Sequence, residues 1–193
     1  MLRNKLNPRA KYVYESRNHS DCCVSYFHMC RDLPWFNFQD GTFDYFFEAF
    51  MAGELCNGDY FEHVLHGCAR RNEPNVLFFT CEILKADTPG MFTELTYFLG
   101  GQYVKMFEQD GHLLRTIMRS SSLELMGRLF EPNASDIAAI VPNFNKTNFA
   151  MSRAFGNGRP ETFKLFRKRQ VTAWRVHFTS ERARRPQAKL EEK

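Results

Sequence analysis

The feature that most constrains the fold is a short apolar run, Val76-Leu77-Phe78-Phe79, which follows the helix-breaking pair Pro74-Asn75. A continuous apolar run of this kind is typical of a strand buried on both faces of a parallel sheet. A second β-prone run, Tyr12-Val13-Tyr14, lies far upstream, and the segment between the two runs has helical spacing. Strands separated in this way predict an α/β domain with a parallel sheet. Two strands are too few for a complete sheet, so we expect only part of one.

Apolar residues recur at the helical spacing i, i+3, i+4, i+7 in three stretches between these runs: Cys23 to Cys30, Phe43 to Phe50 and Phe61 to Cys68. Each stretch predicts an amphipathic helix. Asn18 or Ser20 would cap the first helix, Thr42 would cap the second, and Gly53 would end it. Beyond the second strand, Thr88 is expected to cap a further helix.

Two later segments lack the pattern of a packed element. Residues 131–163 hold many Asn, Gly and Pro residues and predict a long loop. Residues 182–193 are basic and have almost no apolar side chains, which predicts a disordered tail. We therefore expect a partial domain over residues 1–181, followed by this tail.

Composition narrows the class of protein. The chain is 44% hydrophobic and 25% charged, as in ordinary globular proteins. Its net charge of +4 is too small for a dedicated nucleic-acid binder. No apolar run reaches the roughly 18 residues that a membrane span needs. The polar, basic start has no signal peptide, and the six cysteines form no CxxC pair. We expect a cytoplasmic protein with no nucleic-acid or membrane partner.

Arg17 and Ser25 are the first candidate ligand-binding residues. Arg17 follows the first predicted strand, and Ser25 lies in the first turns of the next helix. Ligands of open α/β sheets bind beyond the carboxyl ends of the strands, where helix N-termini favour anions. A guanidinium and a hydroxyl at this place would suit a phosphate. The plainer interpretation is an exposed arginine and a serine on a helix surface.

A second candidate is the basic run Arg167-Lys168-Arg169, which would make a phosphate clamp or a solvated charged face. The serine run at residues 120–122 would cap a helix or offer hydroxyls to a ligand. His63 and His66 are three residues apart, but no third ligand has suitable spacing, so we predict no metal site.

Four segments together resemble the cytosolic sulfotransferases in order and spacing. Residues 11–28 read KYVYESRNHSDCCVSYFH, similar to that family's strand, Arg-Asn-Pro turn and Val-Ser-Tyr-Tyr-His helix. Residues 42–64 keep its Gly-x-x-x-x-Gly-x-x-x-x-His-Val spacing. Residues 76–100 resemble its strand, acidic turn and Phe-Leu-Gly helix. Residues 166–174, FRKRQVTAW, resemble its Arg-Lys-Gly-x-x-Gly-Asp-Trp signature.

The resemblance implies a sulfotransferase fold, here an incomplete P-loop-NTPase-like parallel sheet flanked by helices and lacking its first strands. It implies 3′-phosphoadenosine 5′-phosphosulfate (PAPS) as co-substrate and a small acceptor with a hydroxyl or amine. Its product would be adenosine 3′,5′-bisphosphate (PAP). The residues that match the family's nucleotide site are Arg17, Ser25, Ser121, Arg167, Lys168 and Arg169. Of these, Ser121 would lie near the adenosine, and Arg169 replaces a glycine next to the 3′-phosphate.

The sequence also departs from the family pattern. Cys81 stands where the family has a tyrosine that contacts adenine. In the dimerisation motif, Arg184 replaces a glutamate, which argues against a family-style homodimer. The family's phosphosulfate loop and its catalytic histidine would both lie upstream of Met1. We therefore expect no catalytic residue in this chain, and no sulfotransferase activity from it alone.

Two alternatives stay open at this point. One is a non-catalytic paralogue that binds PAP. The other is a nucleic-acid or membrane-surface binder that uses the arginine-rich segment from Arg182 to Lys189.

Overall fold

The computed structural model of the protein describes residues 6–33, 36–129 and 173–192. Its elements are β1 (Tyr12–Ser16), α1 (His19–Asp32), α2 (Phe43–Ala52), α3 (Tyr60–Ala69), β2 (Val76–Thr80), α4 (Cys81–Ala86), α5 (Thr88–Leu99), α6 (Gly101–Gln109), α7 (Leu113–Ser120), α8 (Leu123–Leu129), the 3₁₀ turn η2 (Ala173–Val176) and α12 (Ser180–Glu191). The loop predicted over residues 131–163 and the basic run at residues 167–169 lie outside the described residues.

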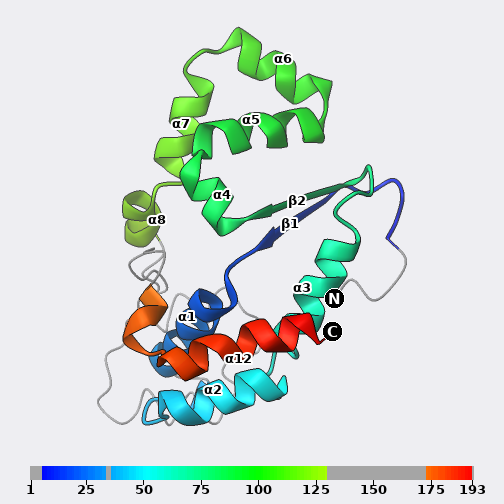
Figure 1. Ribbon diagram of the computed structural model, residues 1–193. Helices are drawn as coiled ribbons and strands as arrows, with labels where there is room; N and C mark the ends of the chain where they lie inside the picture. Colours follow the sequence, from blue (N-terminus) through cyan, green and yellow to red (C-terminus); the bar gives the residue numbers. More distant parts are fainter. Residues whose placement is uncertain (1–5, 34–35, 130–172, 193) are drawn as a thin grey trace, which may run out of the picture.

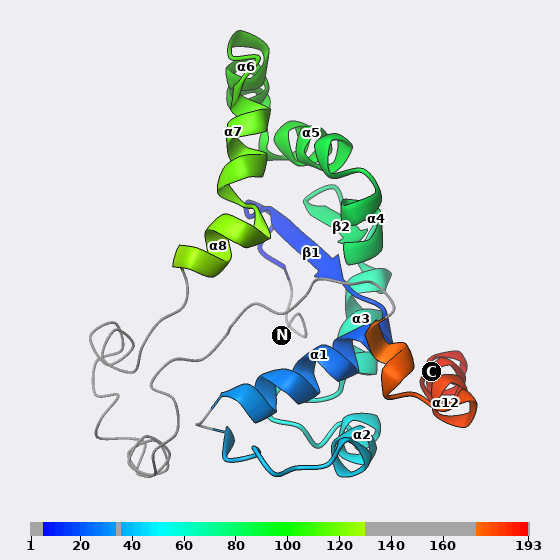
Figure 2. The same ribbon diagram turned by 90° about the vertical axis from the view of Figure 1, so that its left-hand side faces the viewer.

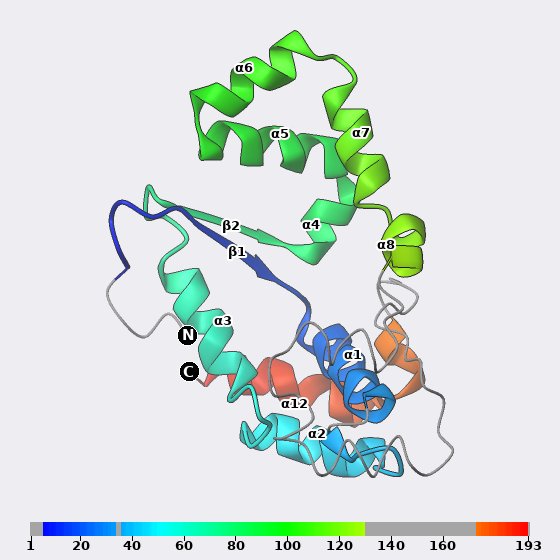
Figure 3. The same cartoon turned by 180° about the vertical axis from the view of Figure 1, so that it is seen from behind.

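The two predicted strands pair with each other in parallel, which confirms the predicted α/β class. The register runs from Tyr12 opposite Val76 to Ser16 opposite Thr80. Figure 1 shows the strands between two groups of helices, with α4 to α7 on one side and α1, α2, α3 and α12 on the other. The view from behind in Figure 3 shows the same order, with α5 and α3 on opposite sides of the strands.

The helix boundaries follow from local side-chain chemistry. Asn18 caps α1 by accepting hydrogen bonds from the backbone N–H groups of residues 20 and 21. Thr42 caps α2 in the same way, and Gly53 ends it in the left-handed conformation at φ 75°. These caps confirm the sequence interpretation. The cap of α5 was predicted one residue too late, because Asp87 and not Thr88 caps that helix.

An aromatic core joins α1, α2, α3 and the C-terminal segment. Its buried members are Cys23, Val24, Phe27, Cys30, Phe46, Phe47, Phe50, Phe61 and Phe178. Several ring pairs meet edge to face, among them Phe27 with Phe43 at a centroid distance of 5.2 Å. This geometry is favoured by the quadrupoles of the rings, in addition to the burial of their area. Figure 2 shows α1, α2 and α12 gathered around this region, beneath the strands.

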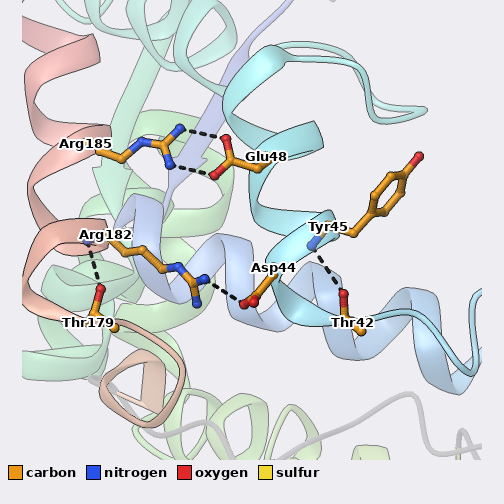
Figure 4. Close-up of polar contacts among 7 residues, drawn as sticks. All are labelled: Thr42, Asp44, Tyr45, Glu48, Thr179, Arg182 and Arg185. Atoms are coloured by element: carbon orange, nitrogen blue, oxygen red, sulfur yellow. Dashed lines mark hydrogen bonds and ion pairs between the residues drawn. The ribbon is translucent and has the colours of Figure 1, made fainter.

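The prediction of a disordered tail is wrong for residues 182–191, which form most of α12. Figure 4 shows the reason: cations spaced along α12 meet carboxylates on α2. Arg182 pairs with Asp44 at 2.7 Å, and Arg185 pairs with Glu48 at 2.6 Å. Exposed ion pairs contribute little by themselves. Both arginines, however, also place their guanidinium groups over the Phe47 ring, which adds a cation–π attraction.

A glycine sets the distance between α3 and the sheet. A Cβ atom on Gly67 would come within 2.4 Å of the Tyr14 ring. The Tyr14 hydroxyl donates a hydrogen bond to the carbonyl of His63 at 2.9 Å, in the same helix. Tyr14 therefore packs on α3 at the position where α3 has no side chain.

We expect Gly67→Ala to destabilise the protein by about 1–3 kcal/mol, because the added methyl group has no room. This loss should outweigh the roughly 1 kcal/mol by which alanine favours a helix over glycine. Urea unfolding followed by circular dichroism measures it. Gly101→Ala is the matched control, since nothing lies within 4 Å of its Cβ position. Equal stability of Gly67→Ala and the wild type would refute the close contact.

Candidate functional site

The carboxyl ends of β1 and β2 meet at one edge of the sheet, because Ser16 lies opposite Thr80. Arg17 follows β1 directly, and Cys81 and Glu82 follow β2. Ligands of parallel sheets bind at such an edge. The structure therefore brings the β1–α1 turn and the start of α4 together at the place expected for a ligand.

Two cavities open at this edge, and Arg17 lines both. The first, called here the α1 cavity, has a volume of about 550 Å³ and is also lined by Cys22, Ser25, Tyr60 and His63. The second, the α4 cavity, has a volume of about 480 Å³ and is lined by Glu15, Cys81, Lys85, Phe92 and Ser121 besides Arg17. A ligand that extends from one cavity to the other would pass Arg17.

The six candidate residues have different places in this arrangement. Arg17 and Ser25 line the α1 cavity together. Ser121 lines the α4 cavity with Arg17, and Ser25 is not part of that wall. The Ser121 hydroxyl donates to the carbonyl of Ile117 at 2.9 Å. Arg167, Lys168 and Arg169 lie outside the described residues, so their part in the site stays a prediction.

The serine run also has the capping role that the sequence left open. The Ser122 hydroxyl accepts a hydrogen bond from the N–H of Leu125 at 3.3 Å, at the start of α8. Ser122 thus caps the helix, and both Ser121 and Ser122 line the α4 cavity.

The Arg17 guanidinium is placed to attract an anion. Among the ion pairs within the described part of the chain, none involves Arg17. Its charge acts on the thiol of Cys22, in the next helix. Burial raises the pKa of Cys22 to about 11, and the Arg17 cation opposes this rise. Cys22 is therefore a neutral thiol at neutral pH, and the positive charge of Arg17 is not cancelled by it.

Sequence analysis missed two residues that contact the Arg17 turn. The Tyr60 hydroxyl donates to the carbonyl of Arg17. Glu82 accepts a hydrogen bond from the N–H of Asn18, with a distance of 3.1 Å from nitrogen to Oε1. The position of Glu82, two residues after the second strand, was a usable signal, since parallel strands end at a common edge. No local pattern marked Tyr60.

The α4 cavity holds a carboxylate and a thiol that contact each other. The Cys81 thiol donates a hydrogen bond to Glu15 at 2.9 Å. Burial, this hydrogen bond and the charge of Glu15 raise the pKa of Cys81 to about 12. The lining of this cavity therefore includes a neutral thiol beside a carboxylate.

The histidine pair on α3 has ordinary structural contacts. His66 bonds through Nδ1 to the carbonyl of Glu62 at 2.6 Å. The His63 ring lies 5.0 Å from the Tyr14 ring, and burial lowers the pKa of His63. Over the described residues, no group of three metal-binding side chains was found.

Comparison with known proteins decides the family. The family model described as "Sulfotransferase domain" matches residues 1–193. The chain belongs to the sulfotransferase family. This confirms the resemblance drawn from the four sequence segments.

Individual relatives agree with this assignment. Human sulfotransferase 1C2 is 27% identical over 172 residues, which cover 88% of this chain and 49% of the relative. The chain thus spans about half the length of the curated sulfotransferases that it matches. A crystal structure of mouse sulfotransferase SULT7A1 complexed with PAP superposes with a TM-score of 0.62 at 26% identity. The match covers 94% of this chain and 56% of that one.

A further solved structure supports the sulfotransferase fold. Retinol dehydratase, in complex with androsterone and the inactive cofactor PAP, has a TM-score of 0.67 at 24% identity. The match covers 94% of this chain and 46% of that chain. Separately, a search of the described helices found none with both the length and the apolar character needed to cross a membrane.

We expect Cys56 to react first with a thiol reagent such as a maleimide. All six cysteines of the protein are free, and Cys56 is exposed at the rim of the α1 cavity. Burial raises the pKa of Cys30 to about 12, so it supplies little thiolate. Mass spectrometry of peptides after limited labelling gives the order. Faster labelling of Cys30 than of Cys56 would contradict the described geometry.

Proposed function

We propose that this chain carries the 3′-phosphate-binding part of a PAPS site. The observation that supports this most is the position of Arg17. It follows β1 at the carboxyl edge of the sheet and lines both cavities, one with Ser25 and the other with Ser121. A guanidinium offers a planar fork of donors that matches phosphate oxygens. The PAP complex of mouse SULT7A1 supports the same ligand class for this chain.

In this proposal the 3′-phosphate binds Arg17 and the Ser25 hydroxyl, and the adenosine extends into the α4 cavity past Ser121. Arg167, Lys168 and Arg169 add positive charge to the same phosphate. Cys81 takes the place of the family's tyrosine beside the adenine. A thiol offers much less area for stacking than an aromatic ring, so we expect a weaker hold on the base.

The parent reaction transfers a sulfuryl group from PAPS to a small acceptor. An acceptor oxygen or nitrogen attacks the sulfur, the bond from sulfur to the bridging oxygen breaks, and PAP leaves with that electron pair. A general base takes the acceptor's proton. We assign neither this base nor a phosphosulfate loop to any of the 193 residues. Binding of PAP without transfer is the alternative function that we propose for the chain alone.

The remaining assignments also stay proposals. We propose a cytoplasmic protein, a small acceptor with a hydroxyl or amine, no metal, and no family-style homodimer. The last rests on Arg184, which is exposed and positive where the family motif has a glutamate.

We expect the protein to bind adenosine 3′,5′-bisphosphate and Arg17→Ala to weaken that binding about 10- to 100-fold. One charge-assisted hydrogen-bonding partner is worth roughly 1.5–3 kcal/mol. Calorimetric titration measures both dissociation constants. Arg9→Ala is the matched control, because Arg9 is exposed and lines neither cavity. A folded wild type without binding, or equal binding by Arg17→Ala, would overturn the proposal.

We expect the 193-residue chain by itself to form no sulfated product from labelled PAPS. We assign it no phosphosulfate loop, and therefore none of the positioning and charge stabilisation that such a loop supplies. The assay uses a panel of phenols, alcohols and amines, with an active sulfotransferase as the positive control. Product above the enzyme-free background would show that this chain holds a complete catalytic set.

A further inference from the structure

One peptide group at the edge of the sheet is held at both of its polar atoms by side chains. It joins Arg17 to Asn18, at the turn from β1 into α1. Its carbonyl accepts a hydrogen bond from the Tyr60 hydroxyl. Its N–H donates to Glu82 Oε1 at 3.1 Å. Tyr60 begins α3 and Glu82 lies in α4, so elements from two sides of the sheet meet on one peptide plane.

The orientation of this plane controls the direction in which the Arg17 side chain leaves the backbone. A peptide group is planar, so holding its oxygen and its hydrogen holds the whole plane, and the Cα atom of Arg17 lies in that plane. No ion pair among the described residues holds the guanidinium itself. The backbone is therefore the part of Arg17 that the surrounding structure anchors.

Both side chains are in the protonation state that these hydrogen bonds need. Burial raises the pKa of the Tyr60 hydroxyl, so it keeps its proton. For Glu82, burial works against the charged form. Hydrogen bonds from Asn18, from its own N–H and from Thr80, together with the Arg17 charge, outweigh burial and lower the pKa. At neutral pH, a protonated donor and an ionised acceptor face the two ends of the peptide.

We propose that Tyr60 and Glu82 are positioning residues of the anion site. By holding the Arg17–Asn18 peptide, they keep Arg17 at the junction of the two cavities, and they act on a bound phosphate through it. This inference rests on the proposed function, in which Arg17 binds the 3′-phosphate. A purely structural role would stabilise the fold without changing the preference for a 3′-phosphate.

The test compares two nucleotides that differ only in that phosphate, adenosine 3′,5′-bisphosphate and adenosine 5′-phosphate. We expect Tyr60→Phe and Glu82→Ala each to weaken the bisphosphate about three- to tenfold, the change typical of one hydrogen bond. Binding of adenosine 5′-phosphate should stay within about twofold of the wild type, because this nucleotide has no 3′-phosphate for Arg17 to bind. Calorimetric titration of the 193-residue chain gives all the constants.

A conservative variant and two controls sharpen the result. Glu82→Gln keeps an oxygen that accepts from the Asn18 N–H, so it should retain most of the bisphosphate affinity that Glu82→Ala loses. Tyr45→Phe and Glu94→Ala make the same chemical changes at exposed positions outside both cavities and should have no effect. Thermal melts establish that each variant is folded. If Tyr60→Phe does not fold, the comparison of Glu82→Ala with Glu82→Gln tests the inference.

Equal weakening of both nucleotides, no weakening, or a Glu82→Gln variant as weak as Glu82→Ala would overturn this inference while leaving the proposed function in place. If the wild type does not bind the bisphosphate, or Arg17→Ala binds it equally well, the proposed function fails and the positioning role fails with it.

Discussion

The parallel pairing of β1 with β2 is the constraint on which the rest of the structure depends. It joins segments more than sixty residues apart, in the register from Tyr12 opposite Val76 to Ser16 opposite Thr80. Because both strands run the same way, the turns that follow them must share one edge. The helices then cover the two faces, and Arg17, Ser25 and Ser121 take their places relative to that edge.

Much of the fold could be predicted because its causes are local. Strands, helix faces and caps such as Asn18 and Thr42 depend on residues within a few positions of each other. The error at α12 has the opposite cause. Arg185 meets Glu48 across 137 residues, and no window of the sequence reveals that the spacing of cations on one helix matches carboxylates on another. Low apolar content alone suggested disorder, although Arg182, Arg185 and Lys189 of this helix lie over phenylalanine rings of α2 and α3.

In the candidate site, too, local contacts could be predicted from the sequence and long-range contacts could not. Arg17 and Ser25 were paired from sequence because a strand, a turn and a helix bring them together over a short distance. Tyr60 and Glu82 could not be assigned a role, because their contacts to the Arg17–Asn18 peptide arise only when α3 and α4 pack on the sheet. Family membership depends on many weak segments in one order, so the resemblance was more informative than any single motif. It says nothing about contacts that are particular to this chain.

The close packing of Gly67 on Tyr14 has a meaning beyond stability. Gly67 lies near the end of α3, and Tyr60 begins that helix. Because Gly67 has no side chain, α3 can approach the strand this closely, and any larger residue would push the whole helix away. The reach of the Tyr60 hydroxyl to the Arg17 carbonyl depends on that close approach. Gly67 therefore takes part in positioning the Arg17 charge through Tyr60, which lies about two helical turns away along α3.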